Sequence, residues 1–135
     1  MQTRYMLDTN TASYIIKGKP AAIRKKLRNV PMASVYISAI TEAELLRGVA
    51  KKPETKNLEV TVQEFLLRLE ILPWDSNAAR SYAHLRTVCE KEGKSLGAMD
   101  MLIAAHSISA KTTLITNDKA FYNIAGYLAL EDWSK

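Results

Sequence analysis

The chain has 135 residues, of which 47% are hydrophobic and 24% are charged. These values are typical of one globular domain over residues 1–135 and exclude a disordered or fibrous chain. The single cysteine, Cys89, excludes an intramolecular disulfide, and the formal net charge of +5 favours a polyanionic partner. No signal peptide or long apolar run is evident, so we expect a cytoplasmic protein without a membrane span.

A strand that ends in polar residues opens the chain. Residues 5–7 are apolar and predict a buried strand, whereas Asp8, Thr9 and Asn10 directly after them cannot continue a hydrophobic core. Ligands of open α/β sheets bind beyond the carboxyl ends of the strands, so Asp8 is a candidate site residue. The alternative is that Asp8 only caps the helix expected over residues 11–17.

The segments that follow alternate between helix and strand. We expect helices over residues 21–29, 41–49 and 58–69 and a strand over residues 35–38. The first of these helices is strongly cationic. We interpret it as a solvated face, with a phosphate-binding surface as the alternative.

The helix expected over residues 41–49 carries a candidate acid. Thr41 and Glu44 have the spacing of a capping box, which gives Glu44 a structural explanation. Gly48 on the same helix predicts the close approach of a neighbouring element.

The second half of the chain repeats the alternation. We expect an edge strand over residues 70–74, a helix from Asp75 or Ser76 to about residue 92, and strands over residues 113–116 and 128–130. Strands that alternate with helices predict one parallel five-stranded sheet with helices on both faces.

Two further acids lie next to apolar segments, where a hydrophobic core alone would not explain a charge. Asp100 lies in the first turn of an apolar helix expected to run to about residue 107, and a charge there needs water or a cation. Asp118 follows the fourth strand much as Asp8 follows the first. We interpret His106, two turns beyond Asp100, as a packed or hydrogen-bonded histidine and not as a metal ligand.

We therefore expect Asp8, Glu44, Asp100 and Asp118 to converge at one edge of the sheet. Uncompensated carboxylates in one crevice raise one another's pKa values, and a hard divalent cation removes their repulsion. Mg²⁺ takes oxygen ligands and keeps several waters, and the chain has no cysteine or histidine cluster of zinc spacing. In a basic protein this pattern favours metal-dependent cleavage of phosphodiesters.

Four motifs in order along nearly the whole chain carry a resemblance to a known family. They are Met6-Leu7-Asp8-Thr9-Asn10, Ser38-x-x-Thr41-x-x-Glu44-Leu45-x-x-Gly48, Gly97-x-x-Asp100-x-x-Ile103-Ala104-Ala105-His106 and Thr116-Asn117-Asp118-x-x-Phe121. With these motifs the chain resembles the PIN-domain ribonucleases, and specifically the VapC toxins of bacterial toxin–antitoxin pairs.

The resemblance implies a single three-layer α/β/α PIN-like domain with a central five-stranded parallel sheet. It implies an endoribonuclease that depends on Mg²⁺ or Mn²⁺ and cuts a structured RNA such as transfer RNA to inhibit translation. The resemblance assigns the catalytic and metal-binding role to Asp8, Glu44, Asp100 and Asp118. It implies that Thr9, Asn10, Thr116 and Asn117 hold the metal ligands or the substrate in position.

The resemblance also implies partners. It implies a homodimer and a cognate antitoxin that lays a tail along a groove and places a basic side chain against the acidic site. A groove beside residues 58–69 for a partner helix is our hypothesis.

Other functions fit the sequence less well. A non-catalytic binding module on the same fold would usually have lost an acid, and all four are present. A DNA-directed nuclease of the same chemistry is an alternative, because the expected metal site does not read a 2′-hydroxyl. A dehalogenase-type phosphatase needs a second aspartate where Asn10 stands, and a receiver domain needs an acidic pair and a late lysine that are not evident.

Overall fold

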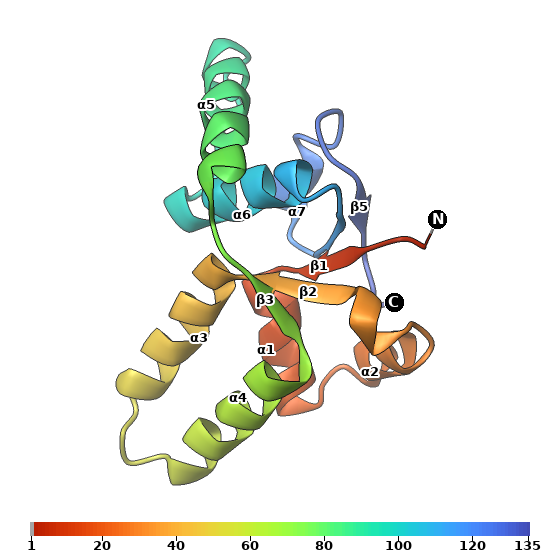
Figure 1. Ribbon diagram of the computed structural model, residues 1–135, viewed down its shortest axis with the longest axis vertical. Coiled ribbons are helices and arrows are strands. Elements are labelled where there is room, and N and C mark those ends of the chain that lie inside the picture. The colour runs from red at the N-terminus through yellow and green to blue at the C-terminus, as the bar shows by residue number, and fades with distance from the viewer. Residues whose placement is uncertain (1) are drawn as a thin grey trace.

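A parallel sheet forms the centre of the computed structural model, which describes residues 2–135 (Figure 1). Over those residues the strands are β1 (Tyr5–Leu7), β2 (Val35–Ser38), β3 (Glu70–Leu72), β4 (Thr113–Ile115) and β5 (Leu130–Glu131). They lie in the order β3-β2-β1-β4-β5, and every neighbouring pair is parallel. The predicted five-stranded sheet with β3 at its edge is therefore confirmed, although β5 lies slightly later than expected.

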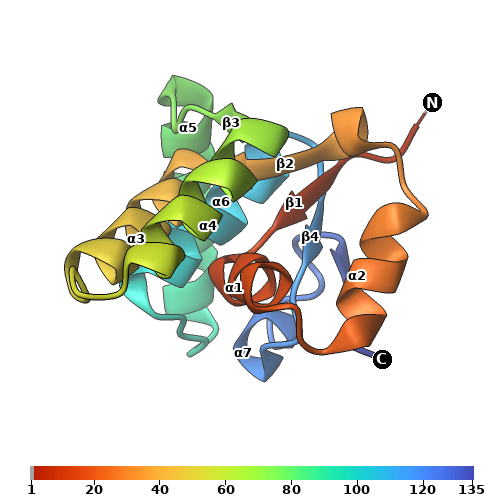
Figure 2. The ribbon, with the colours of Figure 1, turned by 90° about the horizontal axis from the view of Figure 1, so that it is seen from below.

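Helices cover both faces of this sheet, as predicted. They are α1 (Thr9–Lys17), α2 (Ala21–Arg28), α3 (Ala39–Ala50), α4 (Lys56–Arg68), α5 (Ser76–Lys91), α6 (Ala98–Ser109) and α7 (Lys119–Tyr122), and a short 3-10 turn (Met32–Ser34) precedes β2. In Figure 1, α1 to α4 lie below the sheet and α5 to α7 above it. The view from below in Figure 2 shows α1 between the α3–α4 hairpin on one side and α2 on the other.

The alternation of side chains along the strands explains the two layers. Met6 and Leu114 point to the face covered by α5, α6 and α7, whereas Leu7, Ile37 and Ile115 point to the face covered by α1 to α4. All five side chains are buried. Strands buried on both faces are what a parallel sheet requires, and each face has its own hydrophobic core.

The helix α6 is the most deeply buried helix near the sheet. Most of its residues from Met101 to Ser107 are inaccessible, which confirms the prediction from its apolar sequence. His106 is 3% exposed, and its Nδ1 lies 2.7 Å from the hydroxyl of Ser38 at the end of β2. His106 is thus a hydrogen-bonded core residue, as expected. Within residues 2–135, no helix is both long enough and apolar enough to cross a bilayer.

Two predictions about α3 were wrong. The helix begins at Ala39, because Ser38 ends β2 and its hydroxyl accepts the Ile40 N–H at 3.0 Å as the N-cap. Thr41 already lies inside the helix and is buried, so it forms no capping box with Glu44. A Cβ added at Gly48 would meet no atom within 4 Å, so this glycine borders open space and not a closely packed neighbour.

Candidate metal centre

The four predicted acids lie on or directly beside elements that meet at the carboxyl edge of the sheet. Asp8 follows β1 directly and Asp118 follows the neighbouring strand β4, while Glu44 lies on α3 just after β2. Asp100 lies in the first turn of α6. The chain leaves β1 for β2 on one side, and β4 pairs on the other, so this edge is also a topological switch point.

The negative charges of the other three acids all act on Asp100. Its burial, followed by the negative charges of Asp118, Asp8 and Glu44, raises the pKa of Asp100 to about 6. All three of these carboxylates must therefore lie close enough to repel its ionised form. The structure thus brings together the four side chains that the sequence predicted.

Asp8 is the most buried member of the group. Its side chain is 2% exposed, and burial raises its pKa despite hydrogen bonds from Thr116 and Thr11, with the charge of Asp118 adding to the rise. The Thr11 N–H donates to Asp8 Oδ1 at 2.7 Å, so Asp8 also caps α1. The Asp8 N–H donates to the Ile115 carbonyl at 3.1 Å and fixes the residue at the junction of β1 and β4. The interpretation of Asp8 as a helix cap is therefore confirmed, and its role as a site residue stays a prediction.

Asp118 repeats this arrangement at the tip of β4. Its Oδ1 accepts the Ala120 N–H at 2.9 Å and caps α7, and its own N–H donates to the Thr116 hydroxyl at 3.0 Å. At both strand tips one carboxylate oxygen is occupied by a helix cap. Asp8 also accepts a side-chain hydrogen bond from Thr116.

Glu44 is held by a threonine from another element. Thr9 Oγ1 donates to Glu44 Oε1 at 2.5 Å and also lies 3.3 Å from the Thr41 hydroxyl. Thr9 therefore joins the start of α1 to the acid on α3. Asn10 is exposed and Asn117 is half-buried, and the positioning roles of both stay predictions.

The donor set fits a hard divalent cation. Across residues 2–135 the ion pairs are Arg86–Glu90 and Lys94–Glu92, so no basic side chain neutralises the four acids. The acids supply only oxygen donors, which suit Mg²⁺ or Mn²⁺. In the same part of the chain, no three acidic, histidine or cysteine side chains form a ready-made coordination cluster. Mg²⁺ does not need one, because it binds through one or two carboxylates and keeps several waters.

Tyr122 was not predicted as a residue near this site. Its hydroxyl donates to the Thr116 carbonyl at 3.2 Å. Burial raises its pKa, and the charges of Asp132, Asp8 and Glu131 add to the rise. The sequence feature that could have identified Tyr122 is its position four residues after Asp118, which is one helical turn along α7.

A groove leads away from Glu44 between α1, α3 and α4. It has a volume of about 230 Å³, with Thr9 and Glu44 at one end. Apolar side chains line it, and lysines stand along it: Ile16, Leu45, Leu58, Val62, Lys17, Lys51 and Lys52. We call this the α3–α4 groove.

Known proteins share both the sequence and the fold. The model of the PIN domain family matches residues 5–127. The chain is 38% identical over 133 residues to the tRNA(fMet)-specific endonuclease VapC of Salmonella typhimurium, covering 96% of this chain and 98% of that protein. It is 31% identical over 131 residues to the protein of the same name from Shigella flexneri, covering 97% of this chain and 98% of that protein.

The fold is similar to that of solved complexes. The structure of VapBC2 from Rickettsia felis bound to a DNA fragment from their promoter matches with a TM-score of 0.87 at 36% identity, covering 97% of this chain and 99% of that one.

Proposed function

Because this chain belongs to the PIN-domain family, and within it to the VapC proteins, we propose that it is a metal-dependent endoribonuclease and the toxin of a toxin–antitoxin pair. The observation that carries the proposal is the group of four unneutralised carboxylates, in which the pKa of Asp100 is raised to about 6. Charge of this kind, gathered at the ligand-binding edge of a basic α/β protein, supports a cation and a polyanionic substrate.

Asp8, Glu44, Asp100 and Asp118 would hold the Mg²⁺ or Mn²⁺. When bound, such an ion supplies activation of a water and neutralisation of charge at the phosphate. The chain's own residues position the acids. The helix caps hold Asp8 and Asp118, and Thr9 holds Glu44. Asp8 is buried, so water has little access to its carboxylate.

RNA is the substrate that the relatives support, since two of them are named tRNA(fMet)-specific endonuclease. We propose that the target is an exposed loop of a structured RNA such as a transfer RNA. Unstacked loop bases can be splayed out and read, which the paired regions of an RNA helix do not allow.

The test is Mg²⁺-dependent cleavage of total cellular RNA by the purified protein. We expect cleavage at discrete sites, lost in chelator and reduced ~100-fold or more in Asp8→Asn. The asparagine keeps an oxygen for the α1 cap, so the variant should melt close to the wild-type temperature. Intact RNA from a folded protein that binds Mg²⁺, with DNA cut instead, would overturn the choice of RNA.

We also infer that a cognate antitoxin inserts an amphipathic helix in the α3–α4 groove. Similar chains are found in VapBC complexes, and the groove offers an apolar lining with three lysines. A helix with acidic residues beside its apolar stripe would match both features. Because the groove ends at Glu44, the chain following that helix would reach the acids, where a basic side chain would be favourable.

Charge reversal tests this partner. Lys51→Glu combined with Lys52→Glu should weaken antitoxin binding about 10-fold at low salt and less at high salt, because exposed charges are screened. Cleavage of RNA by the free variant should be retained. Unchanged antitoxin affinity would contradict the groove as the binding site. The homodimer and the cytoplasmic location stay predictions, and light scattering of the purified chain tests the first.

A further inference from the structure

We propose that a pocket between α5 and α6 binds an unstacked base of the RNA beside the scissile phosphate. The inference rests on the proposed function, because it takes RNA to be the substrate. The pocket has a volume of about 220 Å³, below the roughly 300–1,000 Å³ typical of sites for drug-sized ligands. That size suits a single planar base.

The pocket borders α6, the helix that carries Asp100 in its first turn. Ala98 and Met101 line it from the first turn of α6, and Asp100 stands between them in the sequence. All three residues therefore lie within one helical turn, about 5.4 Å along the axis. An RNA strand with a phosphate at Asp100 would place a neighbouring base within reach of this pocket.

The wall of the pocket is a preorganised stacking surface. The guanidinium carbon of Arg86 lies 5.8 Å from the centroid of the Tyr82 ring, and Arg86 donates to the Tyr82 hydroxyl. Trp74 packs against Tyr82 with centroids 6.1 Å apart and planes at 72°. The Trp74 indole N–H donates to the Leu102 carbonyl at 3.0 Å, which ties this stack to α6. Aromatic rings and arginine planes are the groups on which proteins stack single-stranded bases.

The charges favour a base over a phosphate in this pocket. Arg86 and Lys94 are balanced by Glu90 and Glu92, with which they form ion pairs at 3.5 and 3.0 Å. Both pairs are exposed and therefore weak. The pocket is thus nearly neutral while its wall stays aromatic, so stacking and not charge would hold the ligand.

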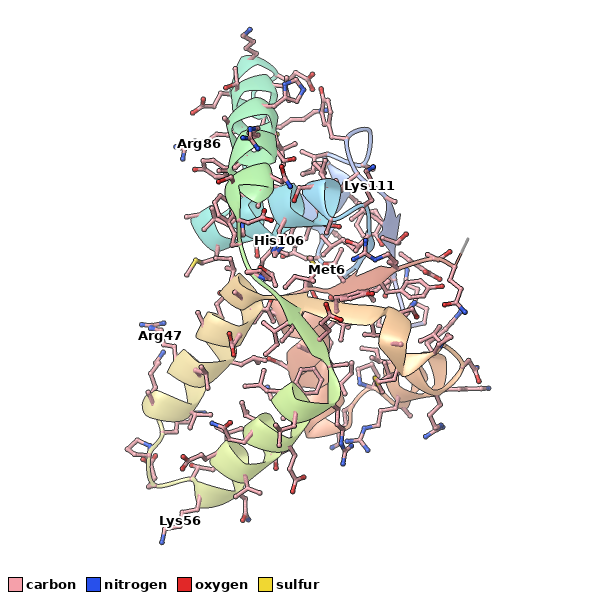
Figure 3. All side chains as sticks on the ribbon, viewed as in Figure 1. Met6, Arg47, Lys56, Arg86, His106 and Lys111 are labelled. Carbon is pink, nitrogen blue, oxygen red and sulfur yellow. The ribbon has the colours of Figure 1, made fainter. Side chains whose placement is uncertain are left out.

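Two arginines also indicate the path of the RNA strand. Figure 3 shows Arg86 on α5 and Arg47 on α3 projecting from the same side of the molecule, above and below the ends of β1 and β2. A phosphate on the α3 side of the acids would meet Arg47, whereas Arg86 stays part of the wall of the pocket. The strand would then run across the acidic site, from α3 toward the pocket.

The experiment measures binding of a short single-stranded RNA in the inactive Asp8→Asn background. The RNA carries 2-aminopurine at successive positions, whose fluorescence is quenched on stacking. We expect Tyr82→Ala and Arg86→Ala to weaken binding about 10-fold and to remove the quenching at one position. Tyr82→Phe should keep both, because it retains the ring. Arg80→Ala is the matched control, since Arg80 lies on the same exposed helix but bonds Asn77.

The outcomes separate this inference from the proposed function. RNA cleavage by the wild-type protein, with binding and quenching unchanged in both variants, overturns the pocket and leaves the function standing. Quenching that depends on Tyr82, together with no RNA cleavage by the wild-type protein, supports the pocket and overturns the proposed function. If Arg86→Ala changes only the oligomeric state, the pocket is covered by a second copy and the inference is wrong. Tyr82→Phe and the exposed Arg86→Ala keep the test valid should Tyr82→Ala fail to fold.

Discussion

Two hollows of nearly equal size flank the acidic edge, and their linings differ. The α3–α4 groove has about 230 Å³ and is lined by aliphatic side chains with three lysines. The α5–α6 pocket has about 220 Å³ and is built on Tyr82 and Arg86. Figure 1 shows the two pairs of helices diverging from opposite faces of the sheet. Aliphatic side chains and flexible lysines suit a protein helix, whereas an aromatic ring under a guanidinium suits a base.

The difference means that an inhibitor and a substrate can use separate surfaces beside one set of acids. The groove ends at Thr9 and Glu44, so its occupant can reach the acids without entering the pocket. Mutations in one hollow should therefore leave the function of the other intact. The following predictions test that separation, from the largest expected effect to the smallest.

Filling the groove should release the nuclease from its antitoxin. Gly48 lines the groove, and open space surrounds the position of its missing Cβ. We expect Gly48→Trp to weaken antitoxin binding about 100-fold, in the range of a lost interface anchor. RNA cleavage by the free protein should be retained. Calorimetric titration with the antitoxin measures the loss.

Gly48→Ala is the control for this variant. A single methyl would not fill the groove, so antitoxin affinity should stay near the wild-type value. The alanine should raise the free energy of unfolding by about 0.5–1 kcal/mol, because glycine in a helix is unfavourable. Equal loss of affinity in both variants would contradict occlusion as the cause.

Removing the Thr9 hydroxyl should affect the acids more than the groove. Thr9→Val keeps the shape of the side chain but breaks its hydrogen bond to Glu44. We expect RNA cleavage and Mg²⁺ affinity to fall about 10-fold, as for other residues that orient metal ligands. Thr9→Ser should retain both. A Thr9→Val protein with wild-type Mg²⁺ affinity would show that Glu44 needs no such support.

Neutralising Asp100 should stabilise the metal-free protein. Its pKa is about 6 in the fold against an ordinary 3.8, so the unfolded chain loses this proton first as the pH rises. Wild-type stability should therefore fall between about pH 4 and pH 6, and Asp100→Asn should reduce that fall to the part that Asp8 causes, since burial also raises the pKa of Asp8. After discounting for partial exposure, we expect a gain of about 1 kcal/mol above pH 6.

Thermal unfolding at several pH values in chelator measures this gain. Adding Mg²⁺ should restore stability to the wild-type protein more than to the variant. A difference between the two proteins that does not change from pH 4 to pH 7 would contradict the assigned cause.

Much of the acidic edge was predictable from sequence, because its signal is local. A carboxylate directly after an apolar strand, or in the polar cluster that ends one, cannot continue a hydrophobic core, and this identified Asp8 and Asp118. Strands alternating with helices predicted the parallel sheet that brings their tips together. Glu44 was predicted as a site residue even though its expected capping role was wrong. The Thr41 spacing matched a capping box by chance, since Ser38 already starts the helix.

The α5–α6 pocket was not predictable in this way. The spacing of four between Tyr82 and Arg86 predicts neighbours on one helix face, but it does not indicate what that face borders. Their relation to Asp100 arises from the packing of α5 on α6. The sequence of α6 is apolar on almost every side, so it does not specify which side α5 will cover. Tyr122 was missed for the same reason, since its contact with the site depends on how α7 folds back.

The caps formed by Asp8 and Asp118 have a consequence for how this protein would lose its activity over generations. Each carboxylate uses one oxygen to start a helix, so folding and the proposed metal site depend on the same two side chains. Replacement by alanine or valine would remove a cap and cost about 1 kcal/mol each time. Asparagine or serine would remove the carboxylate from the proposed metal site, but its side-chain oxygen would still cap the helix. An inactive descendant that keeps the fold should therefore carry asparagine or serine at these positions, and its stability would not reveal what it had lost.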